Sequence, residues 1–306
     1  MSARGGGVLK KIESLASGQR ASRAEKARIV LELRQGHDLA LLLKAADLSR
    51  STFYYQVKTQ QAGDRQADLK SRIRAVYELH KGRYGYRRIT AALRQTGELI
   101  NHKTVQRLMQ ALDLKSLVRP KKYRSYRGQL ASVPNVLARQ FQADRPNQKW
   151  VTDVTEFNVR GEKLYLSPVM DLYNGEIVSY AIQSKPQFSL VSTMLKKALS
   201  KLRNSDMPVL HSDQGWQYHM PAYRRQLAAS GVTQSMSRKG NCLDNAAMES
   251  FFGTLKAEFF HLNRFDSIEQ LKEGLKRYIH YYNHQRIRTK LRGLSPVQYR
   301  NQAFYS

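Results

Sequence analysis

The stretch 149-KWVTDVTEFNVRGEKLYLSPVMDLYNGEIVSYAIQ-183 decides the fold class of this 306-residue chain. Its apolar and β-branched residues predict three strands in quick succession, over residues 149–158, 163–172 and 176–183. The Asn-Gly pair at 174–175 separates the last two segments and is typical of a two-residue hairpin turn. The pattern therefore predicts an antiparallel meander of three strands.

Beyond this meander, helical and strand-like patterns alternate along the chain. They predict a helix over 188–203, a strand over 208–212, a helix over 219–229, a strand over 231–236, and helices over 244–260 and 267–283. Such alternation favours a mixed sheet covered by helices. Asp244 is expected to be the N-cap of the helix that begins there.

Three acidic residues stand at informative positions in this pattern. Asp153 lies in the first strand-like segment, Asp213 follows a short apolar strand, and Glu249 lies in the helix over 244–260, with 35 residues between Asp213 and Glu249. A strand period of two puts Asp153 and Glu156 on opposite faces, and we take Asp153 as the ligand. Carboxylates on separate elements of a basic chain indicate a site for two divalent metals, Mg²⁺ or Mn²⁺, and a phosphodiester.

The predicted helix over 244–260 presents more than a carboxylate. Asn245, Glu249 and Lys256 recur at i, i+4 and i+11, so they share one helical face. We expect Asn245 and Lys256 to contact DNA beside the metal ligand. His211, Asn241 and Asn245 are expected to orient ligands or the DNA strand.

Cysteine and histidine usage argues against other metal chemistry. Cys242 is the single cysteine, so a disulfide within the chain and a Cys-based zinc site are both excluded. His211 and His219 flank Asp213, but no further His or Cys set has the spacing of zinc ligands.

The charge of the chain points to a polyanionic partner. The sequence holds 52 Lys and Arg against 24 Asp and Glu, and residues 1–150 alone hold 31 against 11. Neutralisation of phosphates is the usual reason for such an excess, and a solvated basic surface is the alternative. No apolar run is long enough for a transmembrane helix, and the N-terminus lacks a hydrophobic signal core, so we expect no membrane partner.

The basic first half predicts two helical DNA-binding units. After a flexible leader with a short helix over 1–21, residues 22–60 and 66–114 each match a helix-turn-helix, and a plain three-helix bundle is the alternative for the first. Ser22 and Ser49 are expected to cap helices of the first unit. DNA contacts are predicted from Arg50 in the first unit and from Arg87, Arg88, Lys103 and Arg107 in the second.

A basic linker over 115–146 joins these units to the strand-rich part. Its interleaved tyrosines and its Pro, Asn and Gln content cannot bury much apolar surface. We expect the linker to follow a phosphate backbone, with an inert tether as the alternative. The predicted contacts here are Lys121, Lys122 and Arg124.

Four motifs, WVTDVTEF, HSDQGWQY, SRKGNCLDNAAMESFFGTLKAE and YYNHQRIRTKLRGLSPVQYR, resemble the transposases of the insertion-sequence three (IS-three) family. The resemblance is to the second-frame (OrfB) protein and covers about residues 22–304. It implies an α/β ribonuclease-H-like integrase core over 147–262, preceded by N-terminal all-α helix-turn-helix domains and followed by a C-terminal helix and basic tail over 263–306. It also implies that Asp153, Asp213 and Glu249 are the DDE triad.

The same resemblance implies an activity and its partners. The family performs metal-dependent cleavage and strand transfer at element ends, so double-stranded DNA of the ends and target, a homo-oligomer and an upstream-frame (OrfA) protein are the expected partners. The expected place of action is the bacterial cytoplasm, at the nucleoid. The alternatives are a catalytically silent DNA-binding regulator derived from a transposase, a nuclease of the same fold, and a structural RNA-binding protein.

Overall fold

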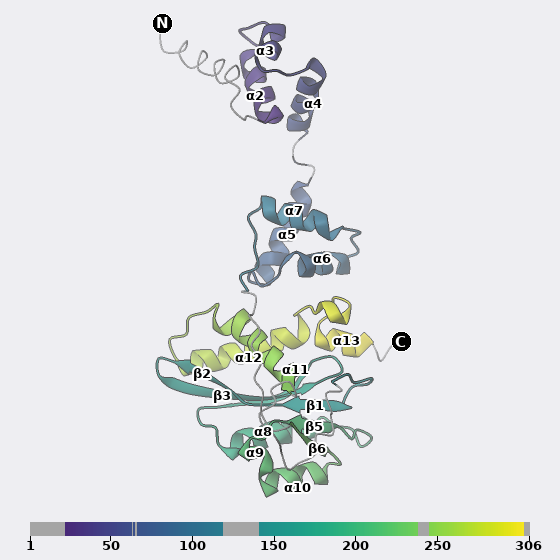
Figure 1. Cartoon of the computed structure of the whole chain (residues 1–306), viewed down its shortest axis with the longest axis vertical. Coiled ribbons are helices and arrows are strands. Elements are labelled where there is room, and N and C mark those ends of the chain that lie inside the picture. The colour runs from purple at the N-terminus through teal and green to yellow at the C-terminus, as the bar shows by residue number, and fades with distance from the viewer. Residues whose placement is uncertain (1–21, 63, 65, 119–140, 238–244, 303–306) are drawn as a thin grey trace. The chain divides into compact units, whose positions relative to one another are not determined.

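Residues 22–62, 64, 66–118, 141–237 and 245–302 are described by the computed structural model of the chain (Figure 1). The chain divides into two units, Met1–Ser71 and Arg72–Ser306. The predicted leader over 1–21 and the predicted linker contacts Lys121, Lys122 and Arg124 lie outside the described residues.

The described part of the first unit contains three complete helices, α2 (Arg23–Leu33), α3 (Leu39–Ala45) and α4 (Arg50–Gln61). Ser22 caps α2 in a reciprocal capping box with Glu25, and Ser49 caps α4 by accepting the Thr52 N–H. Phe53 of α4 is fully buried in an apolar cluster with residues of α2 and α3. The two predicted serine caps are confirmed.

Three further helices follow: α5 (Ala67–Leu79), α6 (Tyr86–Gln95) and α7 (His102–Ala111). Each buries an apolar side chain, namely Ile73 on α5, Ile89 on α6 and Val105 on α7. The Asn101 side chain caps α7 by accepting the Lys103 N–H, which places Lys103 in the first turn.

The second unit contains a six-stranded mixed sheet in its described part: β1 (Lys149–Thr152), β2 (Thr155–Val159), β3 (Glu162–Asp171), β4 (Ile177–Gln183), β5 (Val209–Ser212) and β6 (Thr233–Met236). β3 pairs antiparallel with β4 on one side and with β1 and β2 on the other. β1 also pairs parallel with β5, which pairs parallel with β6. The predicted meander and mixed sheet are thus confirmed.

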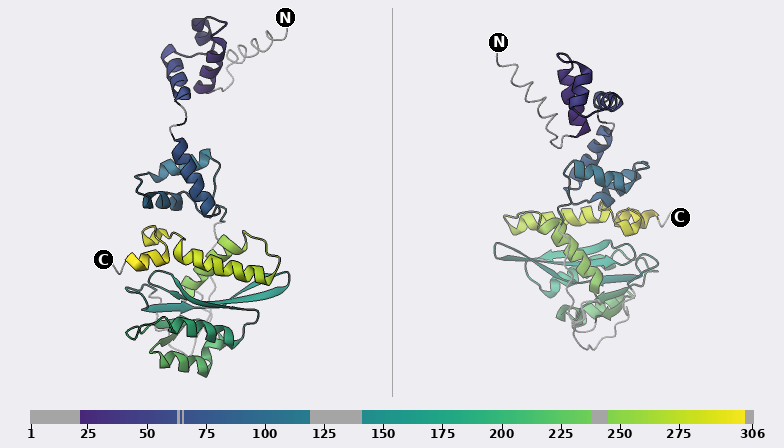
Figure 2. Two further views of the ribbon diagram at one scale, coloured as in Figure 1. Left: turned by 180° about the vertical axis from the view of Figure 1, so that it is seen from behind. Right: turned by 45° about the horizontal axis from the view of Figure 1, so that its top comes forward.

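Helices cover both faces of this sheet (Figure 1, Figure 2). On one face, α8 (Phe188–Leu199), α9 (Trp216–His219) and α10 (Pro221–Ala229) bury a cluster around Trp150 and Leu210. On the other, α11 (Ala246–Leu255) and α12 (Ile268–His284) bury a cluster around Val151 and Phe157. η3 (Thr289–Leu291) and α13 (Pro296–Gln302) follow. No described helix is long and apolar enough to cross a membrane.

The tight turn of the meander lies at Arg160–Gly161. These residues have φ of 51° and 91°, as the left-handed positions of a two-residue hairpin turn require. The hairpin between β3 and β4 closes over residues 172–176 instead, with Gly175 at φ 74°. The Asn-Gly pair therefore predicted the right hairpin, but the two-residue loop predicted there is wrong.

The strand predicted over 149–158 is interrupted at Asp153 and Val154. β1 and β2 pair with β3 in one continuous register, so Pro168 of β3 stands opposite Asp153. Next to the turn, Val159 and Glu162 form a hydrogen-bonded pair, and in an antiparallel ladder every second pair after it is of the same kind. Asp153 and Pro168 would therefore exchange hydrogen bonds if the ladder were unbroken. Because proline has no N–H, the ladder cannot close there and Asp153 lies outside both strands.

Two segments predicted as single helices are each divided. The segment 219–229 contains α10, which begins at Pro221, because proline is favoured at the first helical position. The segment 244–260 is α11 followed by a π-helical segment, η2 (Lys256–Phe260). Asn245 stands at the N-cap position of α11, and Asp244, the predicted cap, lies outside the described residues.

Candidate active site

Asp153 and Asp213 directly follow the ends of two neighbouring parallel strands. Asp153 comes after β1, which ends at Thr152, and Asp213 comes after β5, which ends at Ser212. Because β1 and β5 run parallel, their carboxyl ends meet at the same edge of the sheet. This is the edge at which open α/β sheets bind ligands.

The start of α11 is tied to the same edge. Asn245 is only 5% exposed, and its side-chain Nδ2 donates to the backbone carbonyl of Thr152 at 3.3 Å. Glu249 lies in the first turn of α11 and is exposed. All three acids therefore lie on elements that begin or end beside Thr152, whereas Asn241 is outside the described residues.

The charges of the three acids are coupled through Asp153. Burial raises the pKa of Asp153, and the negative charges of Asp213 and then Glu249 raise it further, to about 7. The Val154 N–H opposes this rise by donating to Asp153 Oδ1 at 2.7 Å. Within the described ranges, however, no three or more His, Cys, Asp and Glu side chains stand close enough to hold a metal ion. The acids are near enough for Asp213 and Glu249 to repel the charge of Asp153, but the three side chains are not gathered closely enough to coordinate one ion together.

Asp213 is held by the loop that follows β5. Its Oδ1 accepts the Gly215 N–H at 2.9 Å, and burial raises its pKa. The fully buried Tyr218 of α9 is close enough to Asp153 and Asp213 to be affected by their charges. Burial first, and then the charges of Asp153 and Asp213, raise the pKa of its phenol. We did not predict this neighbour from the sequence, although Tyr218 stands five residues after Asp213.

Lys256 of η2 and Glu156 of β2 interact electrostatically with each other. The Lys256 ammonium stands 5.5 Å from the centroid of the Phe157 ring, in the first position of η2. Glu156 is exposed, and its Oε2 accepts from the Tyr165 hydroxyl at 2.7 Å and from Lys163 at 3.1 Å. The choice of Asp153 over Glu156 as a candidate ligand agrees with these surface partners of Glu156.

His211 occupies the interior of the sheet. It is fully buried, and its Nδ1 lies 2.9 Å from the Ser235 hydroxyl on the neighbouring strand β6. His219 lies 3.1 Å from the side-chain carbonyl of Gln214. Both histidines thus have partners within the protein.

Most of the side chains predicted to contact DNA are exposed, but one of them is bonded within the protein. The exposed ones are Arg50, Arg87, Lys103 and Arg107. Arg87 also lines a cavity of about 570 Å³ with Arg94, His102 and Arg292. Arg88, in contrast, is half-buried and donates to Glu258 Oε1 at 3.0 Å. The DNA roles of all these residues, and of Asn245 and Lys256, stay predictions.

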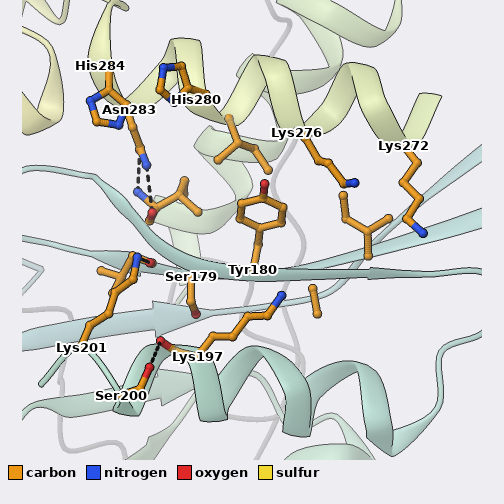
Figure 3. A pocket seen from close by; sticks show the side chains of 15 residues that line it. Ser179, Tyr180, Lys197, Ser200, Lys201, Lys272, Lys276, His280, Asn283 and His284 are labelled. Atoms are coloured by element: carbon orange, nitrogen blue, oxygen red, sulfur yellow. Dashed lines mark hydrogen bonds between the residues drawn. The ribbon is translucent and has the colours of Figure 1, made fainter. Parts of the chain in front are cut away.

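A second basic cavity lies away from the three acids. It has a volume of about 520 Å³ and runs along β4 between α8 and α12, lined by Lys197, Lys201, Lys272 and Lys276 among others (Figure 3). Asn283 closes one end of this strand, because its side chain exchanges two hydrogen bonds of 2.9 Å with the backbone of Ile177. The four lysines give this cavity a positively charged lining.

Family models match most of the second unit. One described as an integrase core domain matches residues 143–242, and a second with the same description matches residues 249–304. A model described as an HTH-like domain matches residues 64–122.

Known proteins are similar over most of the chain. It is 54% identical to InsK for insertion sequence element IS150 of Escherichia coli (strain K12), over 90% of this chain and 98% of that protein. It is 34% identical to transposase InsF for insertion sequence IS3A of the same organism, over 75% of this chain and 81% of that protein. The HTLV-2 integrase catalytic core domain, solved in complex with magnesium, is 17% identical with a TM-score of 0.42, covering 51% of this chain and 98% of that one.

Proposed function

The chain belongs to the insertion-sequence three family of transposases, and from this premise we propose that Asp153, Asp213 and Glu249 are its catalytic triad. The family and the α/β ribonuclease-H-like integrase core expected from the motifs are confirmed. The observation that best supports the triad is the shared edge. Two acids follow the ends of parallel strands, and the helix bearing the third is bonded to the residue before Asp153.

The three side chains fit divalent ions, and we infer two Mg²⁺ or Mn²⁺. Carboxylate oxygens are the ligands that these hard cations prefer. Burial, and then repulsion from Asp213 and Glu249, raise the pKa of Asp153, and a cation bound beside it would relieve that repulsion. Asp153 and Asp213 would share one ion and Glu249 would complete the second site. When bound, such ions stabilise the attacking and leaving oxygens of a phosphodiester.

The proposed reaction has two phosphoryl transfers without a covalent enzyme intermediate. First, a water oxygen attacks phosphorus at the element end, the bond to the 3′ oxygen breaks, and that oxygen takes up a proton. Second, the freed 3′-hydroxyl attacks the phosphorus of another phosphodiester and displaces a second 3′ oxygen, which takes up a proton as the attacking hydroxyl loses one. The chain's own part is positioning, with Lys256 holding the donor end near the acids.

The partners follow from this chemistry. Element-end and target DNA would contact Arg50, Arg87, Lys103, Arg107 and the basic linker, since phosphate neutralisation provides most non-specific affinity. Two ends must be brought together, which calls for a homo-oligomer. An upstream-frame protein is the further expected partner, and the bacterial nucleoid in the cytoplasm is the expected place of action.

Single isosteric substitutions test the triad. The variants Asp153→Asn, Asp213→Asn and Glu249→Gln are incubated with DNA flanking the chain's own gene and Mg²⁺, and the joined products are sequenced. Cleavage and joining should fall by orders of magnitude while DNA affinity is kept. Wild-type-like cleavage by any variant removes that residue from the triad. Metal-independent DNA binding by the wild type without nicking would favour the silent regulator.

A further inference from the structure

Glu258 lies on the far side of the helix that carries Glu249. It belongs to η2, which continues α11, and only 2% of it is exposed. Glu258 stands nine positions after Glu249, roughly two and a half turns of an α-helix. The two carboxylates therefore point to opposite sides of the helix, Glu249 outward and Glu258 into the protein.

Side chains from three parts of the second unit converge on Glu258. Arg286 donates twice to its carboxylate, from Nε and from Nη2, at 2.7 Å each. Arg88 of α6 donates at 3.0 Å, and the Tyr278 hydroxyl of α12 donates at 3.1 Å. Arg83, just before α6, donates from Nε to the backbone carbonyl of Glu258 at 2.9 Å. The end of the helix is thus held both at a side chain and at its backbone.

The carboxylate in this cluster is charged. Burial alone would raise the pKa of Glu258, but the hydrogen bonds and charge of Arg286, and then those of Arg88, lower it to about 2. Arg286 is itself only 6% exposed, so each member depends on the other for its counter-charge.

The loop before α6, and α6 itself, are attached to the same region by separate hydrogen bonds. The Tyr84 hydroxyl accepts the Ile287 N–H at 2.8 Å, and it lies 3.3 Å from the Gln285 carbonyl. The Gln95 side chain donates to the Gly293 carbonyl at 2.6 Å. Glu258 therefore sits where the HTH-like segment, α12 and the following loop meet the end of the helix formed by α11 and η2. We call it the catalytic helix because it carries the proposed ligand Glu249.

We propose that Glu258 is a positioning residue that anchors the back of this helix and so sets where Glu249 and Lys256 stand. The helix is tied at its start by Asn245 and at its end by Glu258. A change of one residue in register would turn Glu249 by about 100° around the helix axis. This inference rests on the proposed function, because metal-dependent cleavage is its readout.

The test compares Glu258→Gln with a buried carboxylate elsewhere. Asp171 is also fully buried, accepts the N–H groups of Asn147 and Tyr173, and pairs with Arg300, but does not touch the catalytic helix. For each chain, the cleavage rate and the half-saturating Mn²⁺ concentration are measured well below its thermal midpoint. We expect Glu258→Gln to raise the half-saturating Mn²⁺ at least about tenfold, the effect of losing a residue that orients metal ligands. Asp171→Asn should lower the midpoint with unchanged Mn²⁺ dependence.

Tyr278→Phe decides the matter if Glu258→Gln fails to fold. It removes one hydroxyl and leaves both arginines on the carboxylate, and it should raise the half-saturating Mn²⁺ by a smaller factor. If the half-saturating Mn²⁺ concentration is unchanged in Tyr278→Phe, and in Glu258→Gln where that variant folds, this inference is overturned while the proposed function stands. If the wild-type protein does not cleave DNA with either Mg²⁺ or Mn²⁺, the proposed function is overturned, and this inference with it.

Discussion

Asp153 lies at a break between two strands and close to two other acidic side chains. Pro168 opposite it cannot donate to the ladder, so the strand breaks at this residue. The carboxylate is then surrounded by protein and by the charges of Asp213 and Glu249, which keep its proton bound to about pH 7. In the metal-free protein Asp153 is mostly neutral below about pH 7. A bound cation would replace its proton.

The substitution Asp153→Asn should stabilise the metal-free protein at pH 8. The folded-state pKa of about 7 lies above the unfolded value, so wild-type stability falls as pH rises from about 4 to 7. The difference between variant and wild type should be small at pH 4 and reach at most about 4 kcal/mol above pH 7. Thermal melts across this range in EDTA measure it. A difference that does not change with pH contradicts the coupling.

Lys256→Glu should weaken photo-crosslinking of the protein to element-end DNA. The ammonium stands over Phe157 at the start of η2, and reversing its charge would repel the phosphates it is proposed to hold. Lys196→Glu, in the last turn of α8, is the matched control and should leave this crosslink unchanged. Equal crosslinking by the Lys256 variant and the wild type removes the role.

Some of the proposed functional residues could be predicted from the sequence and others could not. Asp153, Asp213 and Glu249 stood out because strand ends and a helix face are local patterns. Glu258 did not, because its importance comes from Arg286 and Arg88, which are far from it along the chain. Burial of a charge is decided by distant elements, so one sequence cannot reveal it.

At the scale of elements, the catalytic helix is held closely against α12. Gly274 of α12 allows this approach, because a Cβ there would lie 2.6 Å from Cζ of Phe259 in η2. Glycine inside a helix costs about 1 kcal/mol relative to alanine, so the close packing must offset that cost.

Gly274→Ala should therefore destabilise the second unit in spite of its better helix propensity. Overpacking a buried contact costs about 1–3 kcal/mol, which exceeds the gain in propensity. Denaturant unfolding measures the change. Combining it with Phe259→Leu should recover part of the stability, since the two residues touch each other. A higher unfolding free energy for the single variant would show that the packing there is not tight.

Element type was predictable, but several element ends were not. Period-two and helical patterns placed the strands and helices of the second unit, and Ser22 and Ser49 marked helix starts. The break at Asp153 depends on Pro168, a proline in another strand. This cause is not visible in the local sequence around Asp153.

At the scale of the whole molecule, charge is concentrated in the first half and chemistry in the second. Residues 1–150 hold 31 of the 52 Lys and Arg, whereas the three acids follow residue 150. The family models divide the chain in the same way, with an HTH-like domain over 64–122 and the integrase core from residue 143. DNA affinity and strand transfer should therefore be separable by substitution.

Lys103→Ala and Arg107→Ala should each weaken DNA binding while leaving cleavage at saturating DNA intact. Both side chains are exposed on the first turns of α7. Removing a cation that binds a phosphate lowers the slope of log affinity against log salt by about 1. Fluorescence anisotropy between low and moderate salt measures the slope. An unchanged slope in both variants would exclude α7 as a phosphate-binding element.

The most direct test of the central claim is anomalous diffraction from crystals of the protein with element-end DNA and Mn²⁺. The account predicts anomalous peaks within about 2.3 Å of carboxylate oxygens, one between Asp153 and Asp213 and another beside Glu249. DNA-bound crystals with manganese absent from these carboxylates, or held by other residues, would contradict it.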